Sequence, residues 1–86
     1  MRTAADQGDS GSHFIIGVMY DQGQGVPQDY VQSHMWLNLA ASRLTGEDRE
    51  KAVEAGDSVA LLMTPAQIAE AQRLAREWEA AHPREP

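Results

Sequence analysis

The sequence contains no cysteine, few aromatic side chains and few bases. Without cysteine, neither a disulfide nor a thiolate metal site can stabilise the fold. The 7 Lys and Arg residues stand against 13 Asp and Glu residues, which gives a formal net charge of −6 at pH 7. We therefore expect no nucleic-acid partner, because a protein that binds the phosphate backbone needs a basic face.

Long apolar runs are also missing. No run approaches the roughly 18–20 residues of a membrane-spanning helix, so we expect no membrane insertion. The first six residues, MRTAAD, contain no apolar h-region, and we expect no signal peptide. A cytoplasmic location is favoured, although the lack of cysteine does not exclude the periplasm.

The chain does contain enough apolar material for one small folded domain spanning residues 1–86. Its hydrophobic fraction of 42% is too high for a typical disordered chain. A domain of this size buries only about 60% of the surface that its unfolded chain exposes, so its margin of stability is thin. Because only five aromatic residues are present, the core must come mainly from aliphatic side chains and methionine.

Helical periodicity recurs four times, and no stretch alternates apolar and polar residues as a strand does. Helices are expected over residues 10–22 and from Asp29 to about residue 43. A third follows and extends to about residue 63, with Leu62 on its apolar face. The fourth begins at Thr64, where Gln67 completes a capping box. We predict an all-α fold of two antiparallel helical hairpins, residues 9–43 and 45–82.

The first hairpin carries a specific pattern. It consists of residues 17–20 (GVMY), residues 23–30 (GQGVPQDY), Trp36 and residues 40–41, preceded by residues 4–9 (AADQGD). This pattern resembles one Sel-one-like repeat (SLR), a tetratricopeptide-related repeat that is common in bacteria and has a period of roughly 36–40 residues. The second hairpin resembles the divergent C-terminal segment that often closes such arrays. The resemblance implies a short α–α superhelix, and the chain would then be the C-terminal fragment of a longer array.

The repeat residues are expected to have structural roles. Small and rigid residues shape the backbone, and aromatic residues fill the space between helices. Gly17 is expected to let the two helices of the first hairpin approach closely. The structural motif positions are Gly17, Tyr20, Gly23, Gly25, Pro27, Tyr30 and Trp36.

Members of this family are, as the resemblance implies, non-enzymatic scaffolds whose concave face binds other proteins or peptides. They share no catalytic centre, so we expect neither enzyme activity nor a cofactor. Ile15 and Met35 stand where the family often has polar residues, which indicates exposed apolar contacts. The expected partner-binding residues are His13, Phe14, Ile15, His34 and Met35.

A single repeat should leave one apolar edge uncovered, because a solenoid normally needs about three repeats to be stable. We expect this edge at the N-terminal side of the first hairpin. It predicts a homodimer through that edge, or an exchange of N-terminal segments. The acidic charge also fits a partner with a basic surface.

The alternative is a small metal-binding or hydrolytic protein that uses His13 and His34. These histidines fall one on each helix of the first hairpin, which could bring them within reach of each other. A zinc site needs at least three protein ligands, however, and the sequence offers no obvious third. A surface position for both histidines is therefore favoured. The acids at and after Glu47 are interpreted as a solvated helix face.

Overall fold

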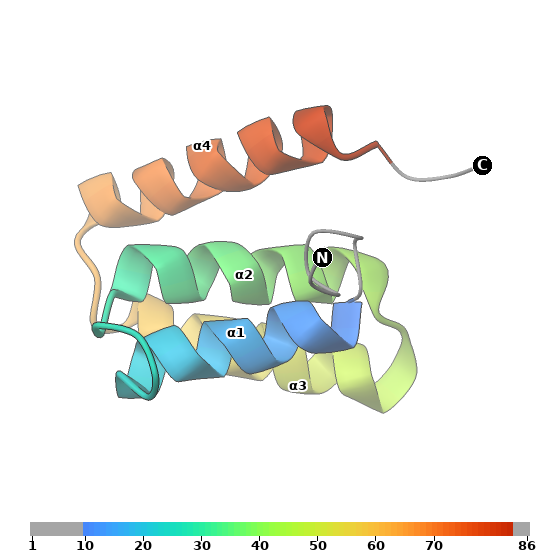
Figure 1. The fold of residues 1–86 in the computed structure, drawn as a ribbon, viewed down its shortest axis with the longest axis horizontal. Helices are drawn as coiled ribbons and strands as arrows, with labels where there is room; N and C mark the ends of the chain where they lie inside the picture. Colours follow the sequence, from blue (N-terminus) through green and yellow to red (C-terminus); the bar gives the residue numbers. More distant parts are fainter. Residues whose placement is uncertain (1–9, 84–86) are drawn as a thin grey trace.

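The computed structural model describes residues 10–83, so residues 4–9 of the repeat pattern lie outside the described part. That part contains four helices and no strand (Figure 1). The helices are α1 (Ser10–Gln22), α2 (Tyr30–Arg43), α3 (Gly46–Ala60) and α4 (Pro65–Ala81). Successive helices run in opposite directions (Figure 1). The predicted all-α fold is thus confirmed, and none of these four helices is long and apolar enough to cross a membrane.

The central element is α2. Helices α1, α3 and α4 all pack against it, whereas α1 and α3 touch each other at only a few points. A short turn joins α3 to α4, but these two helices have little contact with each other (Figure 1). The first pair is therefore a packed hairpin, and the second pair is held together through α2. This arrangement leaves open surface on both sides of α1.

The turn between α1 and α2 uses glycine where the repeat pattern places it. Gly23 and Gly25 have φ angles of 66° and 77°. This left-handed conformation is strained for residues that carry a Cβ atom. The turn is closed by the backbone amide of Asp29, which donates to the carbonyl of Tyr20 at 3.1 Å. Both glycines thus set the direction in which α2 leaves α1.

Helices α1 and α2 approach closely at Gly17, as expected. A Cβ atom at this position would lie 2.7 Å from Cγ of Leu37, a side chain that is only 1% exposed and would have to shift. The buried hydroxyl of Ser33 donates to the carbonyl of Gly17 at 2.7 Å. The small size of Gly17 therefore allows α1 and α2 to pack closely, and the hydrogen bond from Ser33 holds them together.

Local capping signals set the starts of α2 and α4. The carboxylate of Asp29 accepts a hydrogen bond from the amide of Gln32 at 3.1 Å. At α4, the amide of Gln67 donates to the hydroxyl of Thr64 at 3.1 Å, and the amide of Thr64 donates to the side-chain oxygen of Gln67 at 2.9 Å. These bonds satisfy amides that have no partner within the helix, which is why the sequence predicted both starts correctly.

The main hydrophobic core lies between α2 and α4. Its buried members are Met35, Leu39, Ala71 and Ala75. Partly buried side chains surround them; these are Val31, Trp36, Met63, Leu74 and Trp78. Because α4 packs mainly against α2, this core is what holds the last helix in place.

Helix α3 ends at Ala60, earlier than the sequence predicted. The amides of Leu62 and Met63 donate to the carbonyls of Val59 and Ala60 at 2.9 and 3.1 Å, which tightens the chain into a turn. This turn leaves Leu62 60% exposed, and its neighbour Leu61 is 87% exposed. The expectation that Leu62 lies within the third helix was therefore wrong.

Candidate functional site

A groove separates α1 from α3, and we call it the α1–α3 groove. Phe14 and Ile15 of α1 face Asp48 and Lys51 of α3 across a hollow of about 280 Å³ at one end. A second hollow of about 230 Å³ lies at the other end. Its lining residues are Val18, Asp21, Leu37, Ala55, Ser58, Val59 and Leu62. The lining positions recur at helical spacing on both helices, so the two hollows belong to one side of the helix pair.

Exposed apolar side chains stand at both ends of this groove. Ile15 and Leu62 are each 60% exposed, and each lines one of the two hollows. Leu37, in contrast, is buried and forms part of the floor. Large apolar side chains that are exposed along a groove are typical of surfaces that bind another protein. The α1–α3 groove is therefore the candidate site.

The two helices that border the groove carry an excess of negative charge. Helix α1 has one acid and no base, and α3 has five acids and two bases, so together they contribute a net charge of −4. Asp21 lines one hollow, and Asp48 and Lys51 line the other. The acids on α3 were expected to form a solvated face, and they are indeed exposed. The structure adds that some of them border an apolar groove.

The partner-binding residues predicted from the sequence do not form one surface. Ile15 is exposed as expected, and Phe14 is half-buried in the wall of the same hollow. His34 lines a different hollow of about 110 Å³ between α2 and α3. The groove residues Val18 and Leu62 were missed, because the sequence did not show which sides of α1 and α3 would face each other.

Two of the predicted surface residues are buried. His13 is 0% exposed, because its ring lies against the rings of Trp36 and Trp78, with centroid distances of 5.1 and 4.9 Å. Met35 is 6% exposed and belongs to the core between α2 and α4. It lies one helical turn from Leu39, on the side of α2 that α4 covers. The assignment of His13 and Met35 to an exposed binding surface was therefore wrong.

An aromatic cluster joins α1, α2 and α4. Trp36 and Trp78 meet edge to face with their centroids 5.9 Å apart, and the ring of His82 stacks on Trp78 at 4.1 Å. The guanidinium of Arg43 lies 5.2 Å from the centre of the Trp78 ring and donates a hydrogen bond to the carbonyl of His82. Trp36 thus packs between helices, as expected. The cluster also explains how the end of α4 is fixed to α2.

The two central histidines lie in different surroundings. His13 contacts the ring of Trp36, whereas His34 lies near Asp57 of α3. Positions 34 and 36 are two residues apart on α2 and so face nearly opposite sides of that helix. Among residues 10–83, no group of three His, Asp or Glu side chains is arranged to hold a metal ion. Nothing in this geometry favours a site shared by His13 and His34.

The half-buried ring of His34 is electrostatically unusual. Burial lowers the pKa of His34 from its ordinary value of 6.5, and the negative charge of Asp57 opposes this shift only in part. Nδ1 of His34 is buried and has no hydrogen-bond partner among the described residues. A charged imidazolium in this hollow would lose hydration without gaining a hydrogen bond.

We therefore expect protonation of His34 to destabilise the fold. A pKa that is lower in the folded than in the unfolded state means that stability is full above about pH 6.5 and falls as the pH drops towards the folded value. In a His34→Gln variant, the loss of unfolding free energy between about pH 7.5 and 5.5 should be smaller than in the wild type. Urea titrations at both pH values measure this difference. An equal loss in both proteins would contradict the prediction. Gln24→Ala in the exposed turn is the control, and it should lose as much unfolding free energy as the wild type over this pH range.

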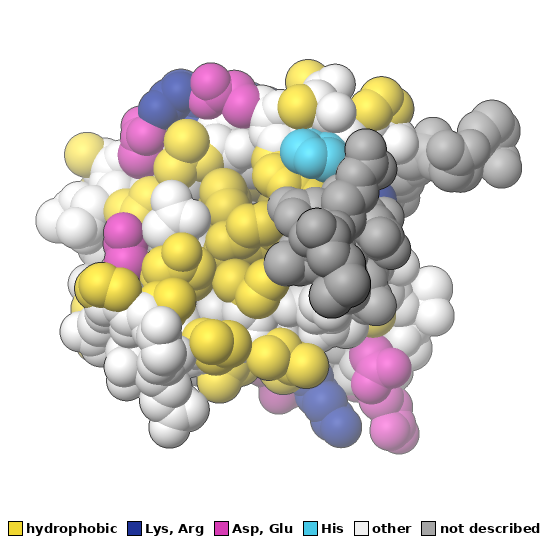
Figure 2. All heavy atoms as spheres, in the orientation of Figure 1, with side chains coloured by type: hydrophobic (Ala, Val, Ile, Leu, Met, Phe, Trp, Pro, Cys, Tyr) yellow, Lys and Arg dark blue, Asp and Glu magenta, His cyan; other side chains and the backbone are white. Residues whose placement is uncertain are grey.

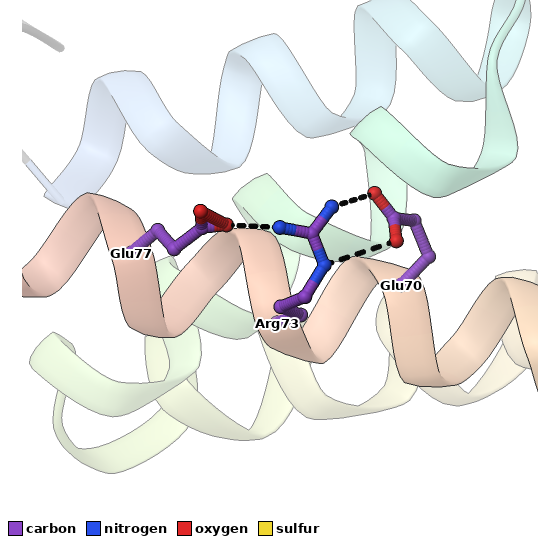
Figure 3. A network of polar contacts seen from close by, with 3 residues as sticks. All are labelled: Glu70, Arg73 and Glu77. Carbon is purple, nitrogen blue, oxygen red and sulfur yellow. Dashed lines mark hydrogen bonds and ion pairs between the residues drawn. The ribbon is translucent and has the colours of Figure 1, made fainter.

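Other features of the surface are less suited to binding. On α4, Arg73 lies between Glu70 and Glu77 and pairs with both (Figure 3). The hydrogen bond to Glu70 raises the pKa of Arg73, and both ion pairs are exposed to solvent. A hollow of about 310 Å³ between α2 and α4 is larger than either hollow of the groove. It is lined mainly by polar side chains, namely Asn38, Ser42, Gln72, Arg76 and Glu79.

A second apolar surface lies on the opposite side of α1. Figure 2 shows hydrophobic side chains gathered over α1 and α2 and up to α4. On α1, the half-buried and uncharged residues Ile16, Met19 and Tyr20 fall on the side away from Phe14 and Val18. A second copy could approach this uncharged edge without the repulsion that the acidic groove would impose. The homodimer through the N-terminal edge stays a prediction.

The fold and groove define a small all-α protein in which α1, α3 and α4 pack around α2. Within this class, the chain matches no family model, no curated protein and no solved structure. The resemblance to an SLR unit therefore rests on the residues of the first hairpin.

Proposed function

We propose that the chain is a non-enzymatic scaffold of the SLR type that binds a segment of a partner protein in the α1–α3 groove. The observation that carries this proposal is the pair of exposed apolar side chains, Ile15 and Leu62, at the two ends of one groove. A bound partner would bury both side chains and so gain the free energy of removing apolar surface from water. Leu37, which forms part of the groove floor, is already buried between the helices.

The roles found for the histidines support a scaffold over an enzyme. His13 is enclosed by two tryptophan rings, and His34 is held between α2 and α3 next to a single acid. General acid–base catalysis needs a side chain that reaches the substrate in a suitable protonation state. Neither ring lines the α1–α3 groove, where a ligand has room. The groove itself offers apolar contacts and carboxylates, which suit recognition of a protein segment.

Site-specific crosslinking tests this proposal. A photoreactive amino acid at Ile15 or at Leu62 should capture the same segment of one partner in both cases. That segment, made as a synthetic peptide, should then bind the unmodified chain. Val53 is the matched control, since it is an exposed apolar residue of α3 that lines neither hollow of the groove. Capture at Val53 but not at Ile15 or Leu62 would refute the groove as the binding site.

A further inference from the structure

We infer that the segment bound in the α1–α3 groove is a basic amphipathic helix of another protein. This inference rests on the proposed function and adds the chemical class of the partner. The spacing of the two hollows indicates a helix, and the negative charge of α1 and α3 indicates a basic one. The net charges of all four described helices argue against a second copy of this chain.

The spacing of the hollows suits an incoming helix. One hollow is lined by Asp48 and Lys51 of α3, and the other extends along the same helix to Val59 and then to Leu62 in the turn that follows it. With a rise of about 1.5 Å per residue, the lining positions from Asp48 to Val59 cover about 17 Å along α3. Apolar side chains about seven to eleven residues apart on one face of a helix would reach both hollows. An amphipathic helix of about 15 residues therefore matches the length of the groove.

The charges around the groove favour a basic partner. Asp21 and Asp48 line the hollows themselves, and α3 presents further exposed acids. The net charge of −4 on α1 and α3 would attract lysine and arginine on the polar face of a helix and repel glutamate and aspartate. Lys51 is the exception in the lining. Helical spacing places Asp48 and Glu54 three residues from it on either side and Glu47 four residues before it. The apolar floor supplies affinity, and the acidic walls select the partner.

A second copy of this chain is a poor occupant of the groove. The described helices carry net charges of −1 for α1, +1 for α2, −3 for α3 and −1 for α4. The single positive helix is α2, and the other three helices pack against it. It could therefore enter the groove of another copy only if its own chain unfolded. None of the four described helices is therefore a suitable basic occupant, and we assign the basic helix to another protein.

Two synthetic peptides of about 15 residues test the inference. In the first, leucine forms one helical face and lysine the other; in the second, glutamate replaces each lysine. The lysine peptide should bind the full chain with a stoichiometry of one, and the glutamate peptide should bind at least about tenfold more weakly. Raising the salt concentration should weaken binding of the lysine peptide. Fluorescence anisotropy measures both affinities, and light scattering of the chain alone records self-association.

Matched variants locate the binding site. Ile15→Ser and Leu62→Ser should each weaken binding of the lysine peptide about fivefold or more, whereas Val53→Ser should not. Asp48→Asn should weaken it, whereas Glu50→Gln, an equal change of charge outside both hollows, should have less effect. Circular dichroism shows that each variant is folded.

The other outcomes contradict the inference in distinguishable ways. If both peptides bind equally and Ile15→Ser weakens both, the groove binds helices without regard to charge, and only the basic class of partner is wrong. If the lysine peptide binds but Val53→Ser and Glu50→Gln weaken it as much as the groove variants do, the binding is a general charge effect and the inference fails. If no peptide binds, or if Ile15→Ser and Leu62→Ser abolish a dimer of the chain, a basic helix is not the occupant. The crosslinking result then decides whether the proposed function fails as well.

Discussion

Replacing Trp78 by alanine should lower the free energy of unfolding by about 3 kcal/mol, because this ring joins α4 to the rest of the molecule. Trp78 contacts the rings of Trp36, His13 and His82, and Arg43 lies over its face. Helix α4 has little other anchorage, since it packs mainly against α2. A domain of 86 residues has a total stability of only about 5–10 kcal/mol, so this loss should be conspicuous.

Urea unfolding followed by circular dichroism measures the effect of Trp78→Ala. Arg73→Ala is the control on the same helix, because its ion pairs with Glu70 and Glu77 are exposed to solvent (Figure 3). Exposed ion pairs contribute little, so the urea midpoint of this variant should stay close to that of the wild type. A Trp78→Ala protein as stable as the wild type would show that the aromatic cluster does not hold α4.

The second large effect is expected at Gly17. A valine there would place its Cβ atom 2.7 Å from Cγ and 2.9 Å from Cδ2 of the buried Leu37. Helices α1 and α2 would have to separate, which would also stretch the hydrogen bond from Ser33 to the carbonyl of Gly17. We expect Gly17→Val to lower the free energy of unfolding by about 2–3 kcal/mol.

Gly56 provides a matched control, because it also faces Leu37 from within a helix. A Cβ atom at Gly56 would lie 3.8 Å from Cβ of Leu37, which is ordinary van der Waals contact. Gly56→Ala should therefore raise the free energy of unfolding by up to about 1 kcal/mol through helix propensity. The predicted opposite signs at two glycines next to the same leucine test the packing of α1 and α3 on α2. A Gly17→Val protein as stable as the wild type would contradict the close packing of α1 on α2 at this position.

The helices and their starts could be predicted because their signals are local. The side chains of Asp29 and Thr64 each accept a hydrogen bond from a backbone amide three residues later that has no partner within the helix. Such a cap depends only on nearby residues and not on the rest of the fold. Gly23 and Gly25 likewise mark a turn through the conformations they permit. The end of α3 was predicted less well, because the apolar residues at 61–63 continue a helical pattern through a turn.

The candidate site was harder to predict, since it depends on which side of each helix meets its neighbour. Helix α1 carries apolar residues almost all around, so its sequence does not distinguish the side of Val18 from that of Met19. His13 and Met35 were misplaced for the same reason, because the packing of α4 on α2 and of Trp78 on His13 covers them. The exposure of Ile15 was predicted correctly from its place where the repeat is usually polar, but the same reasoning failed at Met35, which lies in the core between α2 and α4.

The central claim is that the α1–α3 groove binds a partner helix, and mapping of amide chemical shifts by NMR tests it most directly. At 9.4 kDa the chain is well suited to this measurement. On addition of the lysine peptide, we predict the largest shifts at Ile15 and Val18 on α1 and at Ala55 and Leu62 on the α3 side. Residues near Gln72 on α4 should not shift. The largest shifts on α4, or shifts spread evenly over the surface, would contradict the account.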